Sequence, residues 1–224
     1  MKFLSSCYLQ QGENALSLLL QQYRYREVQV FFACVFMGEG ENADRAGGYM
    51  AEQMLGWFRG LQIKKLYCKR KKEWGKLGNS IFEVIGRVDG ELENCGIMTK
   101  GRKTGIAGVF CLAERYLLFC REAGRIYLLN TAFGYGHVRR ILYKDPGSDL
   151  NMEEGIMEPD IGLLLTTEPF CRYATEIMLK GVLNMGETET QGQMDRRLGE
   201  LAKEAERRGA AYVGAIFFRT SEKV

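Results

Sequence analysis

The chain has 224 residues, of which 46% are hydrophobic and 26% are charged, as in ordinary globular proteins. It contains only three prolines and no low-complexity tract, so we expect a single domain over residues 1–224. The net charge of +3 is too small to indicate a nucleic-acid partner. No apolar run reaches the roughly 20 residues that a membrane-spanning helix needs, which excludes a membrane protein of that type.

Segments of strand length, rich in Val, Ile, Phe, Tyr and Leu, predominate along the chain. In chain order they are 15–20, 28–35, 81–88, 105–112, 116–120, 126–129, 161–167 and 212–219. Two longer segments, 43–61 and 193–208, repeat apolar residues at helical spacing, and the second stops at Gly209. A third helix is predicted over 175–183.

The order of these elements bears on the fold class. Strands and helices do not alternate as they would in a parallel sheet of β-α-β units. The pattern favours an α+β protein in which two antiparallel sheets pack face to face and the helices cover their outer faces.

The seven cysteines are odd in number and include no C-x-x-C pair. Several lie in apolar, strand-like runs, as Cys34 and Cys111 do. This usage is typical of buried, reduced thiols and not of a disulfide framework or a zinc site. We therefore predict a cytoplasmic protein.

One stretch departs from the balanced charge, the basic run from Lys64 to Lys72. We interpret this run as the solvated face or end of a helix, in preference to a patch that binds an anionic partner. No known nucleic-acid-binding motif surrounds it, so we expect no nucleic-acid partner.

A glycine turn follows the apolar run near residue 30 and reads Val35-Phe36-Met37-Gly38. With its flanks, residues 31–58, it resembles the strand, Asp-Gly-Met-Gly-Gly turn and helix of the metal-dependent type 2C (PPM) Ser/Thr protein phosphatases. The Asp binds metal in that family, and here Val35 or Phe36 occupies its position. An apolar side chain cannot coordinate Mg²⁺ or Mn²⁺, which take oxygen ligands.

The first part of the chain carries a second match. Residues 12–16 resemble the family's Asn-Glu-Asp-Ala box, with Glu13 kept and Asn14 in place of the Asp. The family's phosphate-binding Arg lies four positions before the box Glu, and Leu9 occupies that place. The resemblance therefore implies that this chain has lost the phosphate-binding residue.

The remaining matches follow in the family's order, at 105–108, 122–128, 160–170 and 208–216. In the third of them Glu168 replaces a metal-binding Asp. In the last, Ala211 and Tyr212 occupy the position of an Asp-Asn pair. Positions that shape strands and turns are kept, whereas positions that hold metal are changed.

The resemblance implies a four-layer αββα sandwich and, in active members, phosphate-ester hydrolysis by water that a pair of metal ions activates. Two dications at short range require several carboxylates to offset their charge. We therefore interpret the chain as a catalytically inactive phosphatase-like protein without a metal cofactor, acting by binding or regulation in bacterial Ser/Thr phospho-signalling. The partners that the resemblance implies are a Ser/Thr kinase, a phosphoprotein or another phosphatase.

Two alternatives stay open. The chain could be a divergent, weakly active metal-dependent phosphoprotein phosphatase that binds Mn²⁺ or Mg²⁺ through Glu13 and Glu168. It could also be an oligomeric structural or interaction protein that uses only the surface of the sandwich. If the chain is the catalytically inactive phosphatase-like protein, we expect Val35, Phe36 and Tyr212 to fill part of the space in which the family binds metal.

Overall fold

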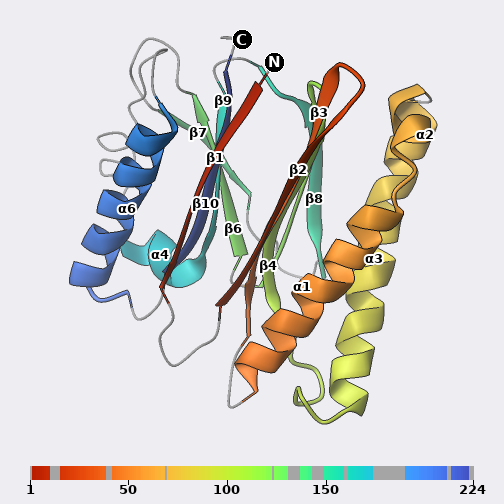
Figure 1. The fold of residues 1–224 in the computed structure, drawn as a ribbon. Helices are drawn as coiled ribbons and strands as arrows, with labels where there is room; N and C mark the ends of the chain where they lie inside the picture. The colour runs from red at the N-terminus through yellow and green to blue at the C-terminus, as the bar shows by residue number, and fades with distance from the viewer. Residues whose placement is uncertain are drawn as a thin grey trace.

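The computed structural model of this chain describes residues 2–10, 16–38, 42–68, 70–122, 124–130, 137–142, 149–158, 161–173, 190–210 and 213–221. Within these ranges the chain forms two five-stranded antiparallel sheets that pack face to face (Figure 1). Sheet A contains, in spatial order, β1 (Lys2–Gln10), β10 (Val213–Ser221), β9 (Ile161–Thr167), β6 (Gly124–Asn130) and β7 (His137–Leu142). Sheet B contains β2 (Leu16–Tyr25), β3 (Val28–Met37), β4 (Gly105–Leu112), β5 (Arg115–Arg121) and β8 (Asn151–Ile156).

Helices cover both outer faces of the sandwich. The described helices are α1 (Ala43–Gly60), α2 (Ile63–Cys68), α3 (Arg70–Asn94), α4 (Glu168–Tyr173) and α6 (Gln191–Arg207). α1 packs on β2 and β3 with α3 beside it, whereas α6 packs on β1 and β10 of the other sheet (Figure 1). The predicted α+β, αββα architecture is therefore confirmed. None of the described helices combines the length and the apolarity needed to cross a membrane.

The strand β3 is an interior strand of sheet B, between β2 and β4, and is buried on both of its faces. Phe31 faces sheet A and stacks on Phe218 of β10, with ring centroids 4.1 Å apart. Its neighbour Phe32 faces the helices and stacks on Phe58 of α1 at 4.9 Å. Burial on both faces explains why this segment is a continuous apolar run without alternation. Burying each large side chain contributes about 1.5–3 kcal/mol.

The sequence around α6 specifies both ends of that helix. Thr190 caps its start, because the Gln193 N–H donates to the Thr190 hydroxyl and the Thr190 N–H donates to the Gln193 side chain. Met194 and Leu198 belong to the stripe that packs on sheet A. Gly209 follows the helix with φ of +108°, a conformation that glycine adopts readily.

The predicted strand over 81–88 is wrong, since these residues lie within α3. The buried side chains of α3 recur at helical spacing and are Trp74, Leu77, Ile81, Ile85, Val88 and Leu92. In a short window the Ile and Val residues of 81–88 are typical of a strand. The helical period becomes evident only when the apolar positions of the whole segment are compared with the i, i+3, i+4, i+7 spacing of a helix.

Several short or edge elements were not predicted, namely β1, β7, β8 and α4, whereas α2 and the start of α3 carry the basic run that was predicted to belong to a helix. β8 alternates half-buried and exposed residues and carries two glutamates, so its apolar signal is weak. The predicted helix over 175–183 lies outside the described residues. The strands predicted to begin at Ala15 and Tyr212 are described from Leu16 and from Val213.

Six of the seven cysteines divide into a buried and an exposed group, and Cys171 is half-buried. The strand residues Cys34, Cys111 and Cys120 are buried as predicted, whereas Cys7, Cys68 and Cys95 are exposed. Burial raises the pKa of the Cys34 and Cys111 thiols well above the ordinary value, so both stay protonated at neutral pH.

Candidate functional site

The end of β3 is the position at which the sequence predicts a lost metal ligand. Val35 is 2% exposed and lies in the core between the two sheets. Phe36 is fully buried on the opposite face of the strand, beneath α1 and α3. Successive side chains of a strand point to opposite faces. Of these two residues, only Val35 borders the space between the sheets.

The turn after β3 packs directly on the start of α1. A Cβ atom on Gly38 would lie 2.4 Å from the carbonyl oxygen of Ala43, so a larger residue would displace the helix from the strand end. Asp44 in the first turn of α1 is exposed, where its charge complements the helix dipole. Glu39 and Glu41 of the same turn lie outside the described residues.

Next to this turn the two sheets touch at the level of the backbone. A Cβ atom on Gly124 of β6 would lie only 1.8 Å from the carbonyl oxygen of Ile106 of β4. Ile106 pairs with Phe36 within sheet B, and Gly124 pairs with Thr167 within sheet A. The two sheets therefore leave no room for a side chain at Gly124. Thr167, the partner of Gly124, directly precedes Glu168.

Glu168, at the start of α4, is the one candidate acid that the structure describes. Its Oε1 lies 3.0 Å from Nη2 of Arg172, and its Oε2 lies 3.9 Å from Nη2 of Arg125. Arg125 is held in place because its Nη1 donates to the carbonyl oxygens of Glu122 and Gly124, at 2.7 and 2.8 Å. Two guanidinium groups thus offset the charge of the carboxylate, and a dication would have to approach against both.

The thiol of Cys171 lies in α4, one residue before Arg172. Burial and the neighbouring Glu168 charge raise its pKa to about 12, although a hydrogen bond with Tyr127 acts in the opposite direction. Reactive cysteines need a thiolate at neutral pH. Cys171 therefore does not supply one.

The other predicted site residues lie at the same end of sheet A or outside the described residues. Leu9 of β1 is 42% exposed and offers no hydrogen-bond donor to a phosphate. Its neighbour Gln10 pairs with Val213 at the end of the β1–β10 ladder. The predicted residues Glu13, Asn14, Ala211 and Tyr212 lie outside the described residues.

The donor set described here does not fit a pair of divalent ions. Val35 and Phe36 have no oxygen in their side chains, and Glu168 is paired with arginines. Among the residues that the structure describes, no three His, Cys, Asp or Glu side chains lie close enough to hold a metal ion. The surface hollows beside α2 are lined by neither Val35 nor Glu168.

Sequence reasoning identified Glu168 and missed its arginine partners. Arg172 lies four residues after Glu168 on one helix, a spacing at which opposite charges meet. That signal was available in the sequence. Arg125 belongs to a different strand, and only the pairing of β6 with β9 brings it to Glu168.

No protein-family model and no curated protein matches this chain, whereas many solved structures share its fold. One is the S. agalactiae serine/threonine phosphatase, with a TM-score of 0.71 and 11% identity over 98% of this chain and 100% of that one. A second is the catalytic domain of the serine/threonine protein phosphatase PstP in complex with two manganese ions, with a TM-score of 0.67 and 10% identity over 99% and 100%. A third is PppA, a regulatory component of the Pseudomonas aeruginosa T6SS, with a TM-score of 0.63 and 14% identity over 98% of both chains.

Proposed function

We propose that this chain, which has the fold of the bacterial type 2C Ser/Thr phosphatases, acts by binding a protein and not by metal-dependent hydrolysis. The observation that carries the proposal is the pair of apolar residues at the end of β3. Val35 and Phe36 are both buried, on opposite faces of the strand. Whether Val35 or Phe36 is matched to the metal-binding Asp of the family, the side chain at that position offers no oxygen ligand.

The surroundings of Glu168 support the same conclusion. In a two-metal site, carboxylates are arranged so that their charge offsets that of the ions. Here Arg172 and Arg125 already provide the positive charge next to the Glu168 carboxylate. The residues that remain favour an ion pair in the place of a metal ligand.

Affinity for a phosphate group is also expected to be low. Leu9 stands where the family has its phosphate-binding Arg, and a leucine side chain donates no hydrogen bond. A partner is therefore expected to bind through the surface of the sandwich and not through a phosphoryl group.

The likeness to phosphatases of bacterial signalling suggests the class of partner. PppA is described as a regulatory component of a secretion system, and other neighbours are Ser/Thr phosphatases. For this chain we propose a cytoplasmic role in Ser/Thr phospho-signalling, with a Ser/Thr kinase, a phosphoprotein or an active phosphatase as partner. This step rests on fold-level analogy.

The experiment that tests this proposal is a phosphatase assay with an aryl phosphate in the presence of Mn²⁺ or Mg²⁺. We expect turnover equal to that of the buffer blank, because without bound metal the attacking water keeps its high pKa. The catalytic domain of PstP, assayed in parallel, shows that the conditions support hydrolysis.

The same assay addresses a divergent, weakly active phosphatase that uses Glu13 and Glu168. This alternative is favoured by one observation, because the Glu168 side chain is 37% exposed and so remains accessible to an ion. Hydrolysis that a chelator abolishes, that Glu168→Ala removes and that the exposed α6 control Glu200→Ala retains would establish this alternative instead.

A further inference from the structure

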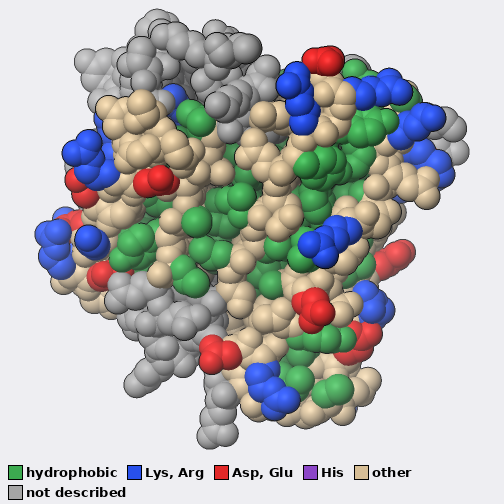
Figure 2. Space-filling model, viewed as in Figure 1, with side chains coloured by type: hydrophobic (Ala, Val, Ile, Leu, Met, Phe, Trp, Pro, Cys, Tyr) green, Lys and Arg blue, Asp and Glu red, His purple; other side chains and the backbone are tan. Residues whose placement is uncertain are grey.

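Positive charge is concentrated in one stretch of this chain. Residues 59–76 contain eight Lys and Arg residues and a single acid, Glu73, which gives a local net charge of +7. Because the whole chain carries +3, all other residues together carry −4. The stretch includes the end of α1, all of α2 and the start of α3. Figure 2 shows Lys and Arg side chains gathered at this corner, at the upper right, over α2 and the β2–β3 hairpin.

A groove runs along this basic stretch between α2 and α3. It has a volume of about 260 Å³, and it is lined by Leu61, Gln62, Lys65, Leu66, Glu73, Lys76, Leu77 and Ser80. Leu66 and Leu77 are buried and form an apolar floor. Lys65 and Lys76 are exposed at the groove, and Lys76 also lies 3.4 Å from the one acid in the lining, Glu73.

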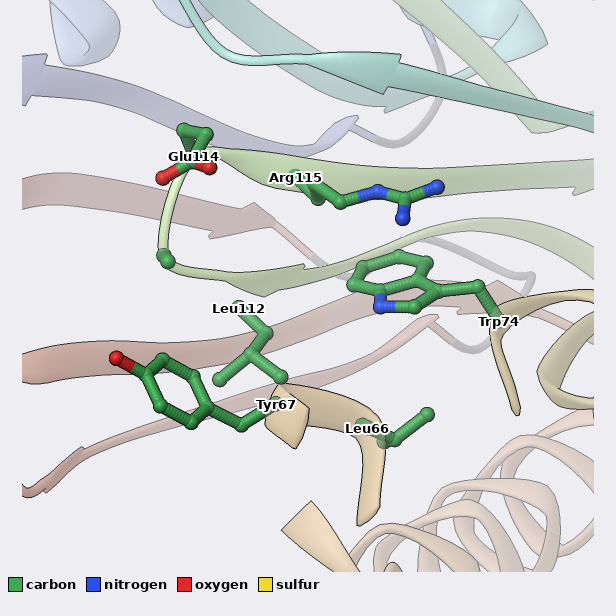
Figure 3. Close-up of a pocket in the computed structure, with 7 residues that line it drawn as sticks. Leu66, Tyr67, Trp74, Leu112, Glu114 and Arg115 are labelled. Atoms are coloured by element: carbon green, nitrogen blue, oxygen red, sulfur yellow. The ribbon is translucent and has the colours of Figure 1, made fainter. Parts of the chain in front are cut away.

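A smaller hollow on the other side of Leu66 has a volume of about 20 Å³, which is room for little more than one water molecule. There the Arg115 guanidinium lies over the Trp74 ring, 4.7 Å from its centroid, while Tyr67 and Leu112 form the opposite wall (Figure 3). Tyr67 in turn packs against Tyr25 of β2, with ring centroids 6.3 Å apart. The rings of Trp74, Tyr67 and Tyr25 are thus engaged in contacts within the chain, whereas the groove between α2 and α3 is open.

The sequence alone favoured a solvated helix end for this basic run over an anion-binding patch; from the groove we propose instead that it binds an acidic segment of a partner protein, in which Asp or Glu residues flank a large apolar side chain. The apolar side chain would lie on Leu66 and Leu77, and the flanking acids would pair with Lys65 and Lys76. This inference rests on the proposed function, since it names the surface and the partner chemistry for a protein that acts by binding. Charge complementarity of this kind guides association and selects the partner.

The lining of the groove favours a protein segment over a nucleic acid or a lipid surface. Proteins that bind single strands stack bases on exposed aromatic rings, and no aromatic residue lines this groove. Peripheral membrane proteins insert protruding apolar side chains into the lipid, whereas Leu66 and Leu77 lie at the floor of a concave site. Apolar anchors in pockets with a charged rim are typical of protein interfaces.

The test is a selection of random dodecapeptides on the full-length protein, followed by affinity measurements with the enriched peptides. The variant Lys65→Glu with Lys76→Glu reverses the rim without touching the buried floor. The control is Lys203→Glu on the outer face of α6, a lysine that is also exposed and lies on the opposite side of the sandwich. Oligouridylate and vesicles that contain phosphatidylglycerol are measured beside the peptides.

We expect the enriched peptides to be acidic with at least one large apolar residue, and their affinity to fall at least about tenfold in the double reversal and not in the control. Affinity should also fall as salt rises. The inference would be overturned if no peptide were enriched over the double variant, or if the enriched peptides lacked acidic residues. It would also be overturned if oligouridylate or vesicles bound more tightly than the peptides and this binding depended on Lys65 and Lys76.

The outcome is separable from that of the phosphatase assay. Peptide binding that depends on Lys65 and Lys76, together with chelator-sensitive hydrolysis, would leave the docking groove established and the proposed inactivity refuted. Loss of peptide selection without any hydrolysis would refute the groove alone.

Discussion

Arg121 of β5 and Asp89 of α3 form a two-point ion pair that joins sheet B to its helices. Nη2 of Arg121 lies 3.0 Å from Oδ1 of Asp89, and Nη1 contacts Oδ2. The third guanidinium nitrogen, Nε, donates to the carbonyl oxygen of Thr104 at 2.9 Å. The two side chains are 2% and 13% exposed, so both charges are largely withdrawn from water. A bidentate, buried pair of this kind fixes the angle of the helix on the sheet.

Asp89→Ala is expected to lower the free energy of unfolding by about 3–5 kcal/mol, because the Arg121 guanidinium would stay buried without its counter-charge. Replacing both residues with apolar ones, Arg121→Met with Asp89→Leu, should recover most of that loss. Urea unfolding measures both. The exposed pair of Arg24 and Glu27 provides the control, since Glu27→Ala should have no measurable effect. If Asp89→Ala were as neutral as Glu27→Ala, water would be replacing the lost carboxylate.

Two glycine-to-alanine changes are expected to have opposite signs. Gly124→Ala would place a methyl group against the backbone of Ile106 and should destabilise the fold by about 1–3 kcal/mol or more. Gly86→Ala, in the middle of α3 with open space around it, should stabilise the fold by up to about 1 kcal/mol. Thermal unfolding of the two variants compares them directly. A neutral Gly124→Ala would show that the sheets can separate at this point without cost.

Restoring an acid at the end of β3 should destabilise the protein in metal-free buffer. Val35→Asp buries a carboxylate in the apolar core between the sheets, at a cost of several kcal/mol, about 3 or more. Combined with Ala211→Asp, it should be partly rescued by Mn²⁺. Val35→Ala separates the effect of charge from that of lost packing.

For the unmodified protein, neither Mn²⁺ nor a chelator should shift the melting temperature. Ligand that binds the native state must raise stability. A melting temperature that rises with micromolar Mn²⁺ would therefore reveal a cation site. It would contradict the interpretation that the residues at this site do not bind divalent ions.

Stability should fall above pH 9 in a way that depends on Cys171. Its thiol has an ordinary pKa of 9.0 and a pKa of about 12 in the folded protein. Between these values the unfolded chain loses the proton and the folded chain keeps it, so stability present below pH 9 is lost as the pH rises. One group contributes about 1.4 kcal/mol per pH unit in this window.

Urea unfolding of the wild type and of Cys171→Ala, at intervals from about pH 8 to about pH 11, measures this contribution as the change in their difference. Cys34 and Cys111 also have raised pKa values and contribute equally to both proteins, so they cancel. A difference that stays constant with pH would mean that the Cys171 thiol ionises as easily in the fold as in the unfolded chain.

The sequence by itself determined the architecture and the chemical identity of the changed positions. The colinear motifs predicted the αββα sandwich, and Val35, Phe36 and Glu168 follow directly from them. These features are local, because a turn glycine such as Gly38 or an apolar strand end can be read within a few residues. Part of α3 was misread as a strand, because the helical spacing of its apolar residues is not evident within the short segment 81–88.

Only the tertiary structure decided which of two adjacent residues faces the space between the sheets. Val35 and Phe36 are equally apolar, and the register of β3 between β2 and β4 assigns them to opposite faces. The same holds for Glu168, whose contact with Arg125 depends on the pairing of β6 with β9. Pairings of this kind bring together residues far apart in the chain, and the free energy that fixes them comes from packing of the whole core, which no local pattern encodes.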